Sequence, residues 1–378
     1  MRLLHISDLH LGKRVGEFSM IEDQRHIINC IFDIIDKCLP QAVLIAGDVY
    51  DKSVPSAESV ELFDDLLFGL SSRGVSTFVI SGNHDSAERI AFGGRLMDKS
   101  GIYMSPVYNG EVSPVTLTDE YGEVFVYMLP FVKPSNVRRF FEDADIQSYT
   151  DALGTAVDAM NIDRSRRNIL ITHQFVTGAL RTESEDISVG GSDNVDASVF
   201  DGFDYVALGH IHRAQACSFG HIRYSGTPLK YSFSEANDVK SVTLVDIGKK
   251  GDVRIELCPL TPLRDMSEIR GTYEQLTLKS FYDNTSYTDD YMHITLTDEE
   301  DVPDALARLR TIYKNVMKLD YDNTRTRSMG RISGADNVKQ RSPLDVFCEF
   351  YQEINGKPMG EEQSEFIKNV ITEIWEEN

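Results

Sequence analysis

The sequence predicts an α/β protein whose larger part, up to about residue 265, contains mixed β-sheets. Short apolar runs recur along the chain, each bounded by polar or glycine-containing turns, as expected for buried strands. Helical patterns lie between the early runs, whereas the later runs have fewer helices between them. The expected strands span residues 2–6, 42–46, 76–80, 124–129, 168–172, 205–208 and 241–245.

Two of the early connections have the period of an amphipathic helix. Residues 21–38 and 57–72 each place apolar side chains on one face, and Gly74 follows the second segment as a stop signal. The apolar face of the first segment contains Ile27, Ile31, Ile34, Ile35 and Cys38, and that of the second contains Val60, Phe63, Leu66, Leu67 and Leu70.

The composition is that of an ordinary globular protein with an acidic surface. The chain has 378 residues, 41% of them hydrophobic, and a formal net charge of −22. This length predicts one sizeable domain with smaller additions. The charge provides no global attraction to nucleic acid, although bound divalent ions or a basic partner can offset it locally.

Cysteine usage and hydropathy predict a cytoplasmic protein that does not enter a membrane. The five cysteines are scattered without a CxxC pair, which indicates reduced thiols. The beginning of the sequence, "MRLLHISDLH", lacks the apolar stretch of a signal peptide. No run approaches the ~18 apolar residues that a membrane span needs.

Polar side chains follow five of the expected strands, at the point where each strand ends. Ligands bind at the carboxyl ends of strands in open α/β sheets, so these groups can converge on one edge. Asp, His and Asn without a thiolate suit Mn, Fe or Zn rather than a structural zinc. The residues are Asp8 and His10, Asp48 and Asp51, Asn83 with His84 and Asp85, His173, and His210 with His212.

Each of these blocks has an ordinary explanation when it is taken alone. "GD" after a strand is often only a turn, and the pair His210 and His212 in "ALGHIHRAQ" is weak support for a metal. Together, each at a strand end, the blocks are hard to explain in this way, because a core does not bury so many ionisable groups unpaired. The two histidines are therefore interpreted as completing a two-metal site.

The order of the blocks, DxH, GDxxD, GNHD, H and GHxH, resembles the calcineurin-like metallophosphoesterase superfamily. Within it, the segments "LHLGKRVGEFSMIEDQ", "SAERIAFGGRLM", "ALGHIHRAQ" and "YSGTPLKYSFSE" look like the SbcD-type DNA repair nucleases. The match is strong over residues 1–270 and looser beyond. It implies a four-layer αββα sandwich with the metals at one edge, a small cap domain and a C-terminal segment that binds a partner.

The resemblance also implies the metal ligands. Side chains two residues apart on a strand point the same way, so the spacing alone would direct His210 and His212 to one ion. The family directs them to different ions, and it leaves the role of Asp51 open, with support of its own loop as one alternative. The implied ligands are Asp8, His10, Asp48 and His212 for one ion and Asp48, Asn83, His173 and His210 for the other, with Asp48 bridging.

Phosphodiester hydrolysis explains why such a site is needed. Two cations ~4 Å apart neutralise the phosphate and lower the pKa of a shared water. His84 is the expected transition-state stabiliser and donor of a proton to the leaving oxygen, with Asp85 as a candidate orienter. Lys13 and Arg14, beside the first block, are candidates to contact the DNA backbone. The remaining histidines, His26, His221 and His293, are expected to be structural.

The chain divides into four expected parts. Residues 1–265 are expected to form the nuclease domain and residues 266–321 a cap. Within the cap, the pattern predicts a strand in "YMHITL", a helix in "PDALARLRTIY" and a strand in "NVMKLDY". Residues 322–341 are polar and contain five Arg or Lys against two Asp. A linker is favoured there over a phosphate contact. Residues 342–378 are expected to be helical.

The last segment is predicted to be a poor DNA binder, because it has nine acidic residues against two lysines, and the resemblance implies that it binds a partner instead. Apolar side chains follow one face of each of its two helices, on either side of "NGKPMG", and the alternative is that both helices fold back onto the core. The residues on these faces are Leu344, Phe347, Tyr351 and Ile354, then Phe366, Ile367, Val370, Ile371, Ile374 and Trp375.

Three functions remain open from the sequence. The leading one, implied by the resemblance, is an Mn²⁺-dependent DNA nuclease that degrades duplex ends 3′→5′ and cuts single strands and hairpins. It implies a homodimer, formed through residues 21–38 and 57–72 unless these pack on the sheet, and a heterotetramer with an SbcC-type ATPase. Another phosphoesterase on the same core would need neither cap nor C-terminal helices. A binding scaffold on an inactive fold need not keep the ligands.

Overall fold

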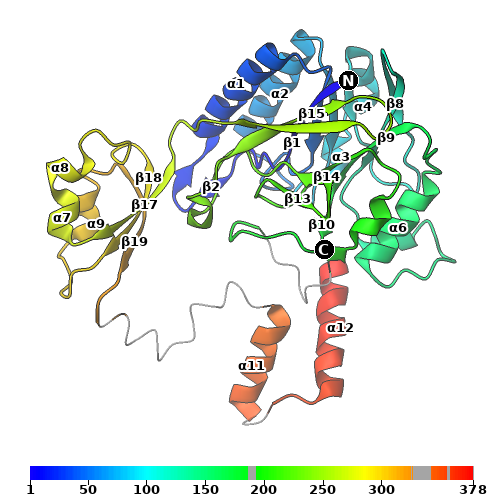
Figure 1. The fold of residues 1–378 in the computed structure, drawn as a ribbon. Helices are drawn as coiled ribbons and strands as arrows, with labels where there is room; N and C mark the ends of the chain where they lie inside the picture. Colours follow the sequence, from blue (N-terminus) through cyan, green and yellow to red (C-terminus); the bar gives the residue numbers. More distant parts are fainter. Residues whose placement is uncertain (186–192, 325, 327–341, 356–357, 378) are drawn as a thin grey trace. The chain divides into compact units, whose positions relative to one another are not determined.

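The computed structural model describes residues 1–185, 193–324, 326, 342–355 and 358–377. The chain forms two compact units, which are drawn in Figure 1. The first unit comprises Met1–Glu185 and Asn194–Met266, and the second takes in Ser267–Asn378.

The first unit contains a six-stranded mixed sheet with the order β16-β15-β1-β4-β5-β6. The strands β1, β4, β5 and β6 run parallel, and β15 runs antiparallel to both β1 and β16. Parallel neighbours bring their carboxyl ends to one edge of the sheet. The strands are β1 (Arg2–Ile6), β4 (Ala42–Ala46), β5 (Ser76–Ile80), β6 (Ile102–Met104), β15 (Ser241–Ile247) and β16 (Val253–Pro259).

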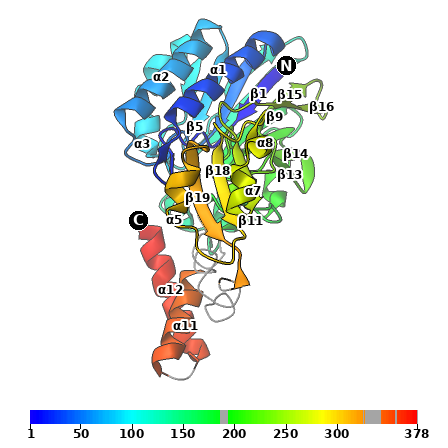
Figure 2. The ribbon, with the colours of Figure 1, turned by 90° about the vertical axis from the view of Figure 1, so that its left-hand side faces the viewer.

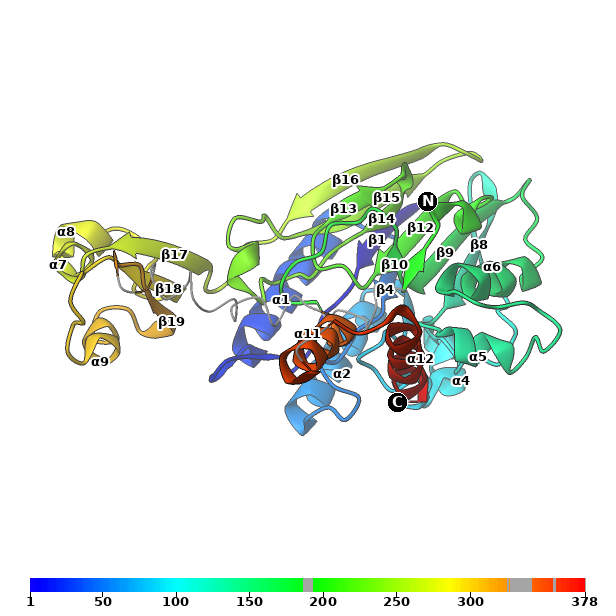
Figure 3. The ribbon, with the colours of Figure 1, turned by 90° about the horizontal axis from the view of Figure 1, so that it is seen from below.

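A second six-stranded sheet has the order β13-β14-β12-β9-β8-β7. Its four inner strands are parallel, and its two edge strands are antiparallel to their neighbours. Figure 3 shows β14, β12 and β9 beside one another. The strands are β7 (Val115–Asp119), β8 (Gly122–Leu129), β9 (Arg167–His173), β12 (Tyr205–Gly209), β13 (Gln215–Cys217) and β14 (Phe219–Tyr224).

The two sheets pack face to face around a common core. Side chains of both sheets, including Leu44 and Phe78 from one and Ile169 and Ala207 from the other, form one buried cluster. On the other face of the second sheet, a separate cluster joins its strands to α5 (Pro134–Arg138) and α6 (Tyr149–Ala159). The helices α1 (Ile21–Cys38) and α2 (Ala57–Ser72) accompany the first sheet. The predicted αββα layering is confirmed.

Local sequence explains where the two long helices lie and how they face. Their bounds match the predicted segments, and Ser56 caps α2 by accepting a hydrogen bond from the backbone N–H of Ser59 at 3.2 Å. Ile27, Ile31 and Ile35 of α1 are buried, as the period indicates. Burying each such side chain contributes ~1.5–3 kcal/mol relative to leaving it in water.

Shorter elements complete the first unit, and the sequence did not predict them. The edge strands, the inner strand β14 and the helices α5 and α6 were also missed, because the edge strands are only partly apolar and both helices are short. The short elements are β2 (Arg14–Val15), β3 (Phe18–Ser19), α3 (Ala87–Ile90), α4 (Gly94–Met97), η1 (Asp98–Ser100), β10 (Phe175–Val176), β11 (Asn194–Val195), η3 (Ala197–Phe200) and η4 (Phe233–Glu235).

The second unit has a small core of its own. The sheet β17-β18-β19 pairs β18 and β19 in parallel, with α9 between them in sequence, and the elements cluster around Leu276, Met292 and Leu309. Figure 2 shows β18 and β19 side by side. The elements are β17 (Met266–Gly271), α7 (Tyr273–Thr277), α8 (Lys279–Tyr282), β18 (Tyr291–Leu296), α9 (Ala305–Leu309) and β19 (Asn315–Tyr321).

Two further helices, α11 (Pro343–Asn355) and α12 (Glu361–Glu377), contact each other near the end of the chain. Most of the expected linker, namely residues 325 and 327–341, lies outside the described residues, so its role stays a prediction. Within the described part of the chain, no helix is both long enough and apolar enough to span a membrane.

Candidate metal centre

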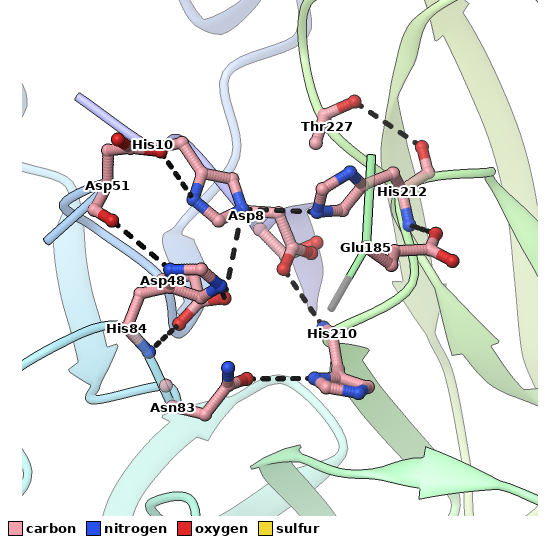
Figure 4. A network of polar contacts seen from close by, with 12 residues as sticks. Asp8, His10, Asp48, Asp51, Asn83, His84, Glu185, His210, His212 and Thr227 are labelled. Atoms are coloured by element: carbon pink, nitrogen blue, oxygen red, sulfur yellow. Dashed lines mark hydrogen bonds and ion pairs between the residues drawn. The ribbon is translucent and has the colours of Figure 1, made fainter. Parts of the chain in front are cut away.

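The side chains predicted to bind metal come from loops at the carboxyl ends of strands in both sheets. Asp8 and His10 follow β1, Asp48 follows β4, and Asn83 follows β5. In the second sheet, His173 is the last residue of β9, and His210 and His212 follow β12. Figure 4 shows the side chains of Asp8, His10, Asp48, Asn83, His210 and His212 converging.

The backbone at this edge adopts unusual conformations. Asp8, His10, Asp48 and His210 have φ values of 54°, 44°, 47° and 104°, in the left-handed region that non-glycine residues rarely adopt. Hydrogen bonds hold the strained loops: Asp8 N–H donates to the Gly47 carbonyl at 3.1 Å, and His10 N–H to the Asp48 carbonyl at 3.0 Å. Strain of this kind is typical of functional sites.

The Asp48 carboxylate lies at the centre of the cluster. Its Oδ2 atom is 3.3 Å from His173 Nε2, 3.7 Å from His10 Nε2 and 3.9 Å from His84 Nε2. The side chain is only 2% exposed. One buried carboxylate oxygen therefore faces imidazoles that belong to both sheets.

On one side of Asp48, the donor atoms of Asp8, His10 and His212 lie within 4.8 Å of one another. His10 Nε2 is 3.1 Å from His212 Nε2, and Asp8 Oδ2 is buried without a hydrogen-bond partner among the described residues. Two ring nitrogens and a carboxylate oxygen thus converge, with too few hydrogens to satisfy all three by hydrogen bonds. A cation would stabilise this arrangement.

On the other side of Asp48, Asn83 joins two histidines. The Asn83 Oδ1 atom is 2.8 Å from His210 Nδ1 and 3.0 Å from His173 Nε2. The opposite ring nitrogen of His173, Nδ1, donates to the Ala46 carbonyl at 2.8 Å. That contact leaves His173 Nε2 directed towards Asn83 and Asp48.

The structure separates His210 from His212. His210 faces Asn83, whereas His212 faces His10. The two-residue alternation of a strand would have placed both rings together, but β12 ends at Gly209 and the positive φ of His210 turns the chain. The two rings therefore lie in different groups of side chains, whereas the spacing alone predicted that they would lie together.

Burial and charge perturb the titration of the cluster. Burial, together with the charge of Asp48, raises the pKa of Asp8 to about 7. Burial opposes protonation of His173, but the Asp48 carboxylate outweighs it and raises the pKa of His173 to about 9. Burial lowers the pKa of His210 to about 3 and places the pKa values of His10 and His212 well below the ordinary value.

These residues fit divalent ions. Neutral imidazole, carboxylate and amide oxygen together form the nitrogen and oxygen donor set of Mn, Fe and Zn sites. A bound cation would compensate the negative charge of the buried carboxylates. It would therefore displace the protons that Asp8 and His173 hold in its absence. The buried His and Asp clusters are thus suited to hold metal.

The residue expected to donate a proton, His84, stands at the edge of the cluster. Its side chain is 22% exposed, whereas those of His10 and His173 are fully buried. Its Nδ1 lies 3.1 Å from the backbone carbonyl of Asp51 and, because a carbonyl only accepts, carries the hydrogen. His84 Nε2 then faces the centre.

Asp85, the residue expected to orient His84, directs its carboxylate to the backbone of two loops. Its carboxylate accepts three backbone N–H groups, from Val49 at 3.0 Å, Tyr50 at 2.9 Å and Gly82 at 2.9 Å. Both oxygens are thereby used to join the loops after β4 and β5. The contact that orients the His84 ring comes instead from the main chain of Asp51.

The two residues expected to contact DNA differ in their surroundings. Lys13 Nζ forms a 2.8 Å ion pair with Asp51 Oδ1, and its side chain is only 16% exposed. Lys13 therefore supports the loop that carries Asp51, and its contact with DNA stays a prediction. Arg14 is exposed and hydrogen-bonded to the Glu17 carbonyl, and its DNA contact stays a prediction.

Sequence reasoning missed the glycines that allow this close approach. A Cβ atom on Gly82 would lie 2.1 Å from Asp48 Oδ1, and one on Gly209 would lie 1.8 Å from the Ala46 carbonyl oxygen. Both glycines stand inside quoted blocks, "GNHD" and "GHIH", so their position beside the ligands was the available signal.

Sequence reasoning also missed a group of polar residues around His212. Glu185 accepts the backbone N–H of His212 at 2.6 Å, and burial raises the pKa of Glu185 to about 7. Figure 4 shows Glu185 and Thr227 beside His212. Of this group, only the segment "YSGTPLKYSFSE", which contains Thr227 and Glu235, was singled out, for its resemblance and without a role.

Comparison with known proteins identifies the family. Residues 1–214 match the calcineurin-like phosphoesterase family, and residues 262–355 match the family described as the type 5 capsule protein repressor C-terminal domain. A crystal structure of a dimetal phosphatase from Danio rerio aligns with 68% of this chain and 95% of that chain, at 11% identity and a TM-score of 0.43.

Curated relatives match over their full length. The chain is 31% identical to the D subunit of the SbcCD nuclease of Staphylococcus saprophyticus over 383 residues, covering 100% of this chain and 99% of the relative. It is 30% identical to the corresponding D subunit of Staphylococcus epidermidis, covering 99% of each. The chain therefore belongs to the calcineurin-like phosphoesterases and, within them, to the family of SbcCD nuclease D subunits, as its sequence motifs predicted.

Proposed function

We propose that this nuclease acts on DNA in repair and recombination, degrading duplex ends with 3′→5′ polarity and cutting single-stranded and hairpin DNA. The observation that carries the proposal is the position of Asp48, whose Oδ2 atom lies between His10 Nε2 at 3.7 Å and His173 Nε2 at 3.3 Å. A carboxylate placed between imidazoles of two sheets suits the bridging ligand of a two-ion site.

The geometry supports two ligand sets that share Asp48. In one, Asp8, His10 and His212 are grouped around a common point, and in the other Asn83 touches both His173 and His210. We propose Mn²⁺ as the preferred ion, because the donors are oxygen and imidazole nitrogen without thiolate. The proposed ligands are Asp8, His10, Asp48 and His212 for one ion, and Asp48, Asn83, His173 and His210 for the other.

Bound ions of this kind neutralise the phosphate and lower the pKa of an attacking water. The protein's own contribution is to hold a proton donor in position and to transfer its proton. His84 offers Nε2 towards the centre, and when the ring is doubly protonated this nitrogen can donate to the leaving sugar oxygen. The Asp51 carbonyl fixes the ring by accepting from Nδ1. Asp85 acts on the backbone of the two loops rather than on the ring.

The C-terminal helices are proposed to bind an SbcC-type ATPase, the partner implied by the name of the relatives. Phe347 and Phe350 of α11 and Phe366 of α12 are exposed, the last by 65%. Aromatic side chains on amphipathic helices are suited to a hydrophobic groove or a coiled coil. Of the other residues proposed for this surface, Leu344, Tyr351 and Val370 are partly exposed, and the side chains of Ile374 and Trp375 lie outside the described residues.

A homodimer, and hence a heterotetramer with the ATPase, is proposed through α1 and α2. These helices bury one face in the first unit, so most of their apolar residues pack in the core and cannot contribute to an interface. Two apolar side chains of α2 are exceptions, because Val60 is 46% exposed and the aromatic Phe68 is 72% exposed. Contiguous exposed apolar surface marks protein interfaces, so these side chains are the candidates for a contact between two copies of the chain.

The decisive experiment measures metal-dependent hydrolysis on several substrates. The chain and its ATPase partner should release nucleotides from duplex ends and open hairpins with Mn²⁺, and not with EDTA. The chain alone should hydrolyse bis-p-nitrophenyl phosphate. Activity on the small ester or on phosphoproteins without cleavage of DNA would instead indicate another phosphoesterase, and no hydrolysis at all would indicate a binding scaffold.

Metal content tests the ligand assignment independently of activity. Asp48→Ala removes the proposed bridge, so it should lose both ions in equilibrium binding of Mn²⁺. Asp36→Ala is a matched control, since Asp36 is an exposed carboxylate on α1 that pairs with Arg73 at 2.7 Å and belongs to neither ligand set. A chain with Asp48→Ala that still bound two ions would show that the ligand assignment is wrong.

A further inference from the structure

A chain of polar contacts leads from the His212 ring into the protein. His212 Nδ1 lies 2.6 Å from Ser184 Oγ, and Ser184 Oγ lies 2.5 Å from Glu235 Oε1. The other oxygen of Glu235 is 2.5 Å from Lys240 Nζ. Glu235 is fully buried and Lys240 is nearly so, which makes this an ion pair inside the protein.

Lys240 determines the direction of the hydrogen bonds, because an ammonium group only donates and has three hydrogens. Its three acceptors are Glu235 Oε2 at 2.5 Å, Thr227 Oγ1 at 2.8 Å and the His212 carbonyl at 2.9 Å. Lys240 therefore contacts the main chain of His212 directly, and it fixes Glu235 as a carboxylate that can only accept.

The next step follows from the single hydrogen of a hydroxyl group. Because Glu235 accepts, the Ser184 hydroxyl donates its hydrogen to Glu235 Oε1. Its oxygen can then only accept from His212, so the hydrogen of that contact belongs to His212 Nδ1. The neutral ring consequently has a lone pair on Nε2, the nitrogen that faces His10 Nε2 at 3.1 Å.

We propose that Ser184, held by Glu235 and Lys240, is a positioning residue that fixes His212 in the tautomer able to bind metal through Nε2. This inference rests on the proposed role of His212 as a ligand. Metal-binding histidines commonly donate their second N–H to a carboxylate or carbonyl. Here a serine hydroxyl stands between the ring and the carboxylate, and it belongs to the segment between β10 and β11.

The same loop holds His212 at a second point. Glu185, the neighbour of Ser184, accepts the backbone N–H of His212 at 2.6 Å. The ring, the N–H and the carbonyl of His212 are therefore bonded to Ser184, Glu185 and Lys240 respectively. Contacts to all three groups restrain both the rotation of the ring and the position of its backbone.

Equilibrium Mn²⁺ binding tests the proposal. Ser184→Ala should weaken one of the two ions by ~10–100-fold, the usual effect of removing such a partner. Ser184→Thr keeps the hydroxyl and should bind close to the wild-type level. Ser232→Ala is the matched control, because Ser232 Oγ contacts the same Glu235 oxygen at 3.2 Å but is directed at that carboxylate and Ser234. It should leave the Mn²⁺ affinity unchanged.

The metal-free protein provides a second measurement that activity does not influence. In chains labelled with ¹⁵N-histidine, the His212 signals, assigned by their loss in His212→Gln, should show hydrogen on Nδ1 and none on Nε2. Ser184→Ala should lose this preference while its unfolding temperature in EDTA stays near that of the wild type. Hydrogen on Nε2 in the wild-type chain would overturn the proposal.

The outcomes separate this inference from the proposed function. If His212→Gln binds both ions with wild-type affinity, His212 is not a ligand and the ligand assignment fails. If His212→Gln loses an ion but Ser184→Ala binds both normally, the ligand assignment stands and the positioning role of Ser184 is refuted. A lowered unfolding temperature of Ser184→Ala with unchanged Mn²⁺ affinity would also refute it, since it indicates a structural role alone.

Discussion

Asp48 contacts His84 at two points: its Oδ1 accepts the main-chain N–H of His84 at 2.9 Å, and its Oδ2 lies 3.9 Å from the ring Nε2. The carboxylate that lies between the histidines of the two sheets thus also positions the proposed proton donor. One buried side chain therefore contacts both the proposed metal-binding histidines and the proposed proton donor, although His84 itself belongs to neither proposed ligand set.

His84→Ala should keep both ions and lose most hydrolysis. Removing a proton donor typically costs ~10²–10⁴-fold in rate, whereas none of the proposed ligands is removed. Metal content and rate should be measured on the same preparation. His26→Ala serves as the control, because His26 lies on α1 and its Nε2 contacts the Thr261 carbonyl at 3.2 Å rather than the centre. Loss of metal together with activity would contradict the role of His84.

Gly82→Ala should disrupt the centre through sterics alone. The added Cβ would lie 2.1 Å from Asp48 Oδ1 and 2.4 Å from Asp48 N, so the carboxylate must move. We expect weaker Mn²⁺ binding and lower hydrolysis. Gly154→Ala is the control, because its Cβ would meet only Val199 Cγ1 at 3.8 Å within the helix α6. That change should stabilise the chain by ~0.5–1 kcal/mol. Normal Mn²⁺ binding by Gly82→Ala would show that the loop yields easily.

The ion pair between Asp119 and Arg167 should make stability depend on acidity. Arg167 donates to both oxygens of Asp119, at 2.6 and 3.0 Å, and holds the pKa of Asp119 well below its ordinary value. A depressed carboxyl pKa contributes stability above the unfolded value of 3.8, and that contribution is lost as pH falls towards the folded value.

Asp119→Asn should therefore destabilise the chain more at about pH 7 than at about pH 3 in urea unfolding. Asp36→Asn removes the exposed pair with Arg73 and should have a small effect at either pH, because solvent screens it. An equal effect of Asp119→Asn at both pH values would show that the pair contributes through packing and not through charge.

Removal of residues 342–378 should abolish binding of the ATPase and ATP-dependent processing of duplex DNA. Hydrolysis of bis-p-nitrophenyl phosphate should survive, because the proposed ligands and His84 all belong to the first unit. Phe347→Asp combined with Phe366→Asp should have the same effect in the full-length chain, since both side chains are exposed. A truncated chain that co-purifies with the ATPase at full strength, or one that unfolds, would contradict the prediction.

Phe68→Ser should convert the proposed homodimer into a monomer in sedimentation experiments at micromolar concentration. The side chain is 72% exposed on α2, so the change should cost little stability in the monomer. Phe140→Ser, at an exposed aromatic residue just after α5, is the control and should leave the mass unchanged. A wild-type chain that sediments only as a monomer would rule out this interface.

The amino-acid sequence by itself determined the layered α/β fold and the residues that gather at the sheet edge. Apolar runs such as 42–46 and 76–80 coincide with β4 and β5, because a strand buried on both faces has a continuous apolar signal. Asp48 and Asn83 follow those strands directly, and parallel strands bring such residues to one edge whatever the details of packing. This part of the organisation depends on local pattern and topology.

Only the tertiary structure decided how each side chain is used. The spacing of His210 and His212 predicted that both rings would point to one place. The turn after Gly209 instead directs His210 to Asn83 and His212 to His10. Asp85 binds backbone N–H groups instead of His84, and Ser184 meets Glu235, which is 51 residues away in sequence. Such partners depend on where distant loops meet and on which donor satisfies which acceptor. The periodicity of the sequence predicts which side chains are buried, but it does not predict which groups they contact in the core.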